Sequence, residues 1–71
     1  MKNGYRTFVI EKSFGAGRAV QRIIHHLAAN NAGEYIEPRA NGADCDTILF
    51  EVCVHNPLIM AWIESELAPF V

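Results

Sequence analysis

The sequence lacks a long apolar run, and it has only two cysteines in 71 residues. Its longest uninterrupted apolar stretch, from Leu58 to Ile63, is far shorter than the roughly 18 residues that indicate a membrane span. The first ten residues also lack the apolar stretch and the small-residue cleavage site of a secretory signal. We therefore expect one domain, residues 1–71, that acts in the cytoplasm and does not contact a membrane.

Cys45 and Cys53 are too few for a disulfide scaffold. If both lie in one extended strand, about 26 Å separates them, whereas a disulfide needs the two Cα atoms within about 7 Å. We expect both thiols to be free. A chain this short obtains only a thin stability margin from its own core, and 51% of its residues are hydrophobic. Self-association is the remaining route to extra stability.

Positive charge is scarce in the second half of the chain, and negative charge is scarce in the first. Up to Gly33, five cations accompany one carboxylate, for a net charge of +4, and from Glu34 onward one cation accompanies seven carboxylates, for a net charge of −6. Such an asymmetry can steer a partner or pair subunits, although solvated faces can also differ in sign by chance. The overall charge of −2 argues against nucleic acid as a partner.

The first half of the chain predicts a strand followed by a helix. Residues 5–12 contain both aromatic and β-branched side chains, which is typical of a strand, with Phe8 and Ile10 on one face. Residues 13–17 form a glycine-bearing turn. Residues 18–30 carry apolar side chains at helical spacing, so we expect the helix to begin near Arg18.

The second half predicts a hairpin and a second helix. Residues 33–39 indicate a strand that lies at a sheet edge or ends at Pro38, because a proline cannot donate to a central ladder. Asn41-Gly42 favours a two-residue hairpin turn, and residues 46–55 are apolar on nearly both faces, as in a central strand. Asn56-Pro57 is typical of a helix start, and Pro69 ends that helix.

The predicted order is β-α-β-β-α, with residues 68–71 left for a short fourth strand or an irregular tail. A right-handed crossover places the third strand between the first two, with both helices on one face. This is an α+β fold, the ferredoxin-like split βαβ sandwich. It leaves the first strand with a free edge and one sheet face with an uncovered apolar patch. The residues of that patch are Thr7, Val9, Leu49 and Cys53.

The predicted turn between the first strand and the first helix is the candidate ligand site. Backbone N–H groups at a helix start can hold an anion, and Arg18 would add a charge-assisted contact. A dinucleotide-binding fingerprint would need a third glycine where Val20 stands. The glycines can also serve only to turn the chain sharply. The candidate residues are Gly15, Ala16, Gly17 and Arg18.

The element order, the chain length and Gly15-Ala16-Gly17 resemble small ligand-sensing ACT domains. The resemblance implies a small molecule, such as an amino acid, bound beside this turn at a dimer interface. Lys12-Ser13-Phe14-Gly15 stands where that family has an Asp and a Pro-Gly pair. The resemblance is one of fold, and fold does not imply function.

Arg18, Arg22 and His25 share the solvent side of the predicted helix and could dock an acidic partner, a phosphate or RNA. A solvated helix face is the alternative. His25 and His26 are adjacent, so on a helix they diverge by about 100° and cannot readily chelate one ion. We expect neither a metal nor another cofactor.

Glu51, Cys53 and His55 alternate along the third predicted strand and therefore project to one side. A thiol beside an imidazole and a carboxylate is the minimal set for an activated nucleophile. A cysteine is also a common small core residue, and we predict no catalytic residues.

Together these patterns favour a non-enzymatic regulatory module that binds another protein and forms a homodimer. The dimer would use the free strand edge or the open sheet face. The alternative is a small-molecule sensor with its ligand at Gly15 to Arg18.

Overall fold

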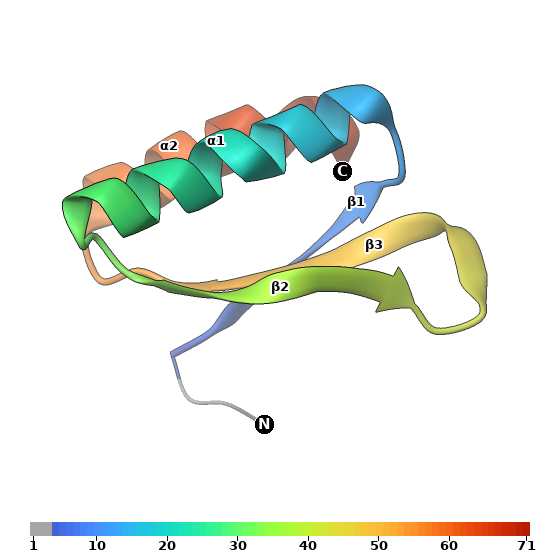
Figure 1. Cartoon of the computed structure of the whole chain (residues 1–71), viewed down its shortest axis with the longest axis horizontal. Helices are drawn as coiled ribbons and strands as arrows, with labels where there is room; N and C mark the ends of the chain where they lie inside the picture. The colour runs from blue at the N-terminus through green and yellow to red at the C-terminus, as the bar shows by residue number, and fades with distance from the viewer. Residues whose placement is uncertain (1–3) are drawn as a thin grey trace.

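A computed structural model describes residues 4–71, apart from the side chain of Asp44. Its elements, in chain order, are β1 (Arg6–Glu11), α1 (Phe14–Asn30), β2 (Glu34–Asn41), β3 (Asp44–Cys53), α2 (Pro57–Leu67) and the 3₁₀ turn η1 (Ala68–Phe70). The strands form one antiparallel sheet in the order β1-β3-β2. Both helices lie on one face of it, so the α+β fold has two layers (Figure 1). The predicted order of elements and the central third strand are confirmed.

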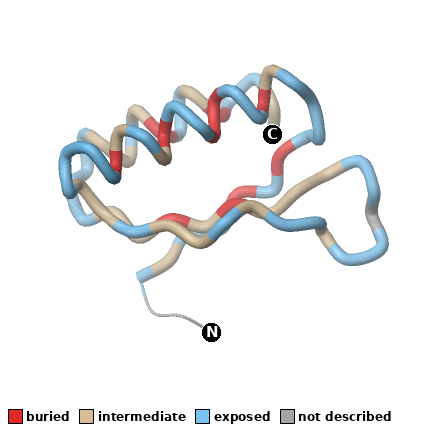
Figure 2. Tube along the Cα trace, viewed as in Figure 1, coloured by how far each residue is buried: buried red, intermediate tan, exposed pale blue. Residues whose placement is uncertain are grey.

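The hydrophobic core lies between the helices and the covered face of the sheet (Figure 2). Alternate residues of β1 and β3 point into it, and Phe8 pairs directly with Phe50. None of the polar or charged side chains that the structure describes is buried. The buried hydrophobic residues are Phe8, Ile10, Ala16, Ala19, Val20, Ile23, Leu27, Phe50, Val52, Ile63 and Leu67.

Helix α1 begins at Phe14, one turn earlier than the sequence predicted. Ser13 is its N-cap, and the Ser13 Oγ accepts a hydrogen bond from the backbone N–H of Ala16 at 3.2 Å. This cap stabilises the first turn and offsets the poor helix propensity of two glycines. The expected turn over residues 13–17 was therefore wrong for residues 14–17, which belong to the helix.

The hairpin turn consists of Gly42 and Ala43, one residue later than predicted. Asn41 pairs with Asp44 across the turn. Gly42 has a φ of +58°, so the left-handed residue occupies the first central position, as in a type II′ turn. Asn41, which was predicted as a turn residue, ends β2, and its side chain donates to the Thr47 Oγ1 at 3.0 Å.

A bulge in β2 changes which side chains share a face. Ile36 pairs with Glu51 and Arg39 pairs with Leu49, so β2 has one more residue than β3 between these pairs. Pro38 lies in this bulge, on an edge strand, where its missing N–H costs no central hydrogen bond. The extra residue brings Arg39 to the same uncovered face as Ile36.

The chain ends in the 3₁₀ turn η1 and not in a fourth strand. The Phe70 ring lies against the first turn of α1, where a Cβ added to Gly15 would be 3.0 Å from the ring. The C-terminus therefore meets the start of α1 (Figure 1). Within residues 4–71, only β3 pairs with β1.

Gly33 lets the start of β2 approach the end of β3, and it provides a test of this packing. A Cβ at this position would lie 2.7 Å from the carbonyl oxygen of Cys53 and 2.8 Å from the Cγ2 of Val54. We expect Gly33→Ala to lower the free energy of unfolding by about 1–3 kcal/mol, because backbone must move. Urea denaturation measures this change.

The matched control is Gly17→Ala in α1, where an added Cβ meets no atom within 4 Å. Because alanine favours a helix over glycine, this variant should be as stable as the wild type or more stable by up to about 1 kcal/mol. Equal destabilisation by the two substitutions would contradict the close approach at Gly33.

Candidate functional site

The sheet face opposite the helices carries all four residues of the predicted patch. Val9 pairs with Leu49 and Thr7 pairs with Glu51, which fixes the alternation along β1 and β3. Thr7 is exposed and 47% of the surface of Val9 is accessible, whereas Leu49 and Cys53 are half-buried. The structure thus brings these residues to one uncovered face.

A polar chain crosses this face and divides the patch. The Thr7 Oγ1 donates to the Glu51 Oε1 at 3.0 Å, and the Arg39 Nη2 lies 2.8 Å from the Glu51 Oε2. Glu51 stands between Leu49 and Cys53 on β3, so the apolar area is interrupted at its centre. Sequence reasoning missed Arg39, because only the bulge in β2 turns it to this face.

The outer edge of β1 has backbone groups that the sheet does not use. The Lys12 N–H donates to the Asp46 carbonyl oxygen at 2.8 Å, directly opposite in the register. Hydrogen-bonded and non-hydrogen-bonded pairs alternate in an antiparallel ladder. The N–H and C=O groups of Thr7, Val9 and Glu11 therefore point away from β3, along the outer edge.

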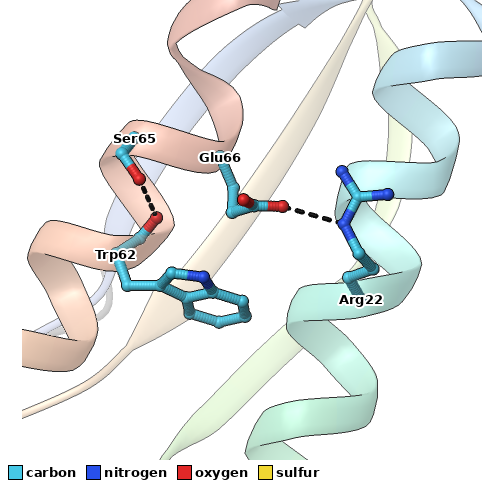
Figure 3. A network of polar contacts seen from close by, with 4 residues as sticks. All are labelled: Arg22, Trp62, Ser65 and Glu66. Atoms are coloured by element: carbon cyan, nitrogen blue, oxygen red, sulfur yellow. Dashed lines mark hydrogen bonds and ion pairs between the residues drawn. The ribbon is translucent and has the colours of Figure 1, made fainter.

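Ion pairs join the basic first half of the chain to its acidic second half. The Arg22 Nε lies 2.8 Å from the Glu66 Oε1, between α1 and α2 (Figure 3). The Arg6 Nη1 pairs with the Glu64 Oε2, between β1 and α2. Part of the charge asymmetry is thus neutralised inside the fold. Lys2, another cation of the first half, lies outside the described residues.

The two adjacent histidines of α1 have different surroundings. His25 is exposed, whereas His26 is half-buried and packs against Trp62 of α2, with ring centroids 4.8 Å apart. Trp62 also packs against the core. Arg22 and His26 thus face α2, and Arg18 and His25 remain on the solvent side of α1. The predicted stripe of Arg18, Arg22 and His25 is exposed, but Glu66 holds one of its members.

An open hollow of about 460 Å³ lies on the first turns of α1. Its lining includes Gly17 and Arg18, which are two of the four predicted ligand-site residues. It also includes Arg22, which belongs to the predicted stripe of Arg18, Arg22 and His25. Gly15 and Ala16 are not part of its lining, since Gly15 faces Phe70 and Ala16 is buried. The lining residues are Phe14, Gly17, Arg18, Gln21 and Arg22.

Cys53 and His55 lie close together at the end of the uncovered face. The Cys53 Sγ lies 4.0 Å from the His55 Nε2, and Glu34 of β2 is the register partner of Cys53. The nearby Tyr5 hydroxyl donates to the Glu34 Oε1 at 3.5 Å. Partial burial and the adjacent Glu34 carboxylate raise the pKa of the Tyr5 phenol above its usual value. Glu51 bonds Thr7 and Arg39 on the same face.

The described residues contain no cluster of three or more histidine, cysteine or acidic side chains placed to hold a metal ion. None of the described helices is long and apolar enough to cross a membrane. No protein-family model, no curated protein and no solved structure matches this chain.

Both cysteines are free, and their exposure predicts their relative reactivity. Cys45 is exposed near the hairpin turn, whereas Cys53 is half-buried beside Gly4 and His55. We expect an aromatic disulfide reagent to modify Cys45 faster than Cys53, because access limits the rate. The variants Cys45→Ser and Cys53→Ser assign the two rates. Faster modification of Cys53 would indicate that His55 activates its thiol.

Proposed function

We propose that this protein is a non-enzymatic protein-interaction module that forms a homodimer through the outer edge of β1. The observation that carries this proposal is the row of outward backbone groups at Thr7, Val9 and Glu11. An edge strand with unused donors and acceptors is a template for pairing with another chain.

We further assign the fold to the ferredoxin-like sandwich, in a form with three strands. The strand order β1-β3-β2 and the two helices on one face support this assignment. In that sandwich, a fourth strand would lie beside β1. Here the residues that would follow α2 form η1 and pack their Phe70 ring on Gly15. A strand from a second copy would fill the same place.

The edge is a better interface than the open face, and the core does not require a partner. The accessible surface is 4640 Å², close to the about 4400 Å² expected for a monomer of this mass. The chain is therefore not short of its own core.

Glu51 and Arg39 interrupt the apolar area of the open face. In β1, by contrast, Val9 lies inside the strand, and the charged residues Arg6 and Glu11 lie at its two ends.

A two-fold axis at Val9 pairs all three outward-facing residues of β1 with one another across the interface. In this register, Val9 lies opposite its own copy, and Thr7 lies opposite Glu11 of the second protomer. The two valines make an apolar contact on the uncovered face.

Small-molecule sensing is the second candidate function, and one observation favours it. Gly17 and Arg18, both predicted as ligand-site residues, line the hollow on α1. The volume of this hollow, about 460 Å³, is in the range of pockets that take small ligands. A ligand that binds only the folded state would raise the melting temperature.

Proline at position 9 tests pairing through the β1 edge. The Val9 N–H points outward, so Val9→Pro removes a hydrogen bond of the dimer but none of the monomer. We expect light scattering to show a dimer for the wild type and a monomer for Val9→Pro. Val9→Ala is the control, because it removes the side chain but keeps the N–H, and it should remain a dimer.

Glu11→Pro, near the end of β1, repeats the test with less risk to the fold, which circular dichroism checks. A wild type that stays monomeric up to millimolar concentration would overturn the proposal. So would a folded proline variant with the same mass in solution as the wild type. Equal dissociation by Val9→Ala and Val9→Pro would instead indicate packing through the sheet face.

A further inference from the structure

The hollow on α1 contains a glycine, Gly17, that the packing of the described residues does not require. Gly15 is next to Phe70, where a side chain would crowd the ring, but a Cβ at Gly17 would meet no atom within 4 Å. Glycine is less favourable than alanine at such an exposed helix position. Gly17 therefore weakens the helix without a gain within the fold, and it opens a notch between Phe14, Arg18 and Gln21.

The rim of the notch combines an exposed aromatic ring with two guanidinium groups. Phe14 is 81% exposed, the highest value among the large hydrophobic residues of the described chain. The guanidinium carbon of Arg18 lies 5.8 Å from the centroid of the Phe14 ring. Arg22 is held to Glu66 through its Nε, and Figure 3 marks this contact at the Nε and not at the two terminal nitrogens.

Arg18 differs from Arg6, Arg22 and Arg39, because none of the ion pairs found within residues 4–71 includes it. An occupant of the hollow therefore meets two guanidinium groups with free donors beside an apolar ring. This chemistry is complementary to a carboxylate next to a large apolar side chain. Each guanidinium can hold a carboxylate by two parallel hydrogen bonds.

We propose that this hollow binds an acidic peptide segment of a partner protein, with an apolar side chain over Gly17 and a carboxylate on Arg18 and Arg22. The net charge of the whole chain is −2, which disfavours a polyanion such as RNA but not a short acidic segment. The proposal rests on the proposed function only in treating the protein as an interaction module. The lining residues all belong to α1, so pairing through β1 leaves them available.

A phage-displayed library of random peptides, panned against the wild-type protein, tests the proposal. We expect the selected peptides to be acidic and to carry an aromatic or aliphatic residue. In NMR titrations with one selected peptide, the amides of Phe14, Gly17, Arg18 and Gln21 should shift. Arg18→Glu should weaken binding roughly tenfold or more, because a charge-assisted hydrogen bond is lost. Lys12→Glu is the control, since it changes the net charge equally outside the hollow, and it should bind within about twofold of the wild type.

Gly17→Ala separates a binding role from a structural one. It should weaken peptide binding while the protein stays as stable as the wild type or becomes more stable, because the methyl group fills the notch. The Val9→Pro variant should bind the peptide as the wild type does. This result keeps failure of the dimer distinct from failure of the peptide site.

Several outcomes would overturn the proposal. One is a set of selected peptides without acidic residues, and another is undiminished binding by Arg18→Glu. A third is that the α1 amides shift with inorganic phosphate, an RNA oligonucleotide or a free amino acid but not with any selected peptide. Shifts that depend only on protein concentration would assign the hollow to a second copy of the chain.

Discussion

The hydrogen-bond ladder of β3 is the interaction on which the rest of the structure depends. Both β1 and β2 pair with β3, and β3 contributes Phe50 and Val52 to the core beneath the helices. Because β3 is central, β1 and β2 are both edges. Because both helices lie on one face, the other face is uncovered (Figure 1). The surfaces that remain for partners follow from this arrangement.

Sequence patterns predicted most of this architecture. They failed where a specific contact, such as a helix cap or a strand bulge, decides the local structure. Periodicity found the five main elements and placed β3 at the centre, because a strand that is apolar on both faces must be covered by neighbours. The start of α1 was misplaced, because Gly15 and Gly17 indicate a loop unless the Ser13 cap is known to form. The bulge at Pro38 could not be predicted, since it depends on how two strands fit together.

The candidate sites were also predictable only where they follow from a regular pattern within one element. Thr7, Val9, Leu49 and Cys53 share a face because strand alternation is regular. Arg39 and its bond to Glu51 were not predictable, and they divide that face. The charge asymmetry of the chain was visible in the sequence, but pairing of Arg22 with Glu66 needs the antiparallel packing of α1 against α2 (Figure 3). The arginine of α1 that none of the ion pairs within residues 4–71 includes is Arg18, beside the exposed ring of Phe14.

Pairing of two β1 edges is the central claim, and hydrogen–deuterium exchange at single amides tests it most directly. The amides of Phe8 and Ile10 bond to β3 in the register and should be protected at every protein concentration. The amides of Thr7, Val9 and Glu11 face outward, so they should be protected in concentrated solution and exchange rapidly on dilution. Rapid exchange of these three amides at all concentrations would contradict the account.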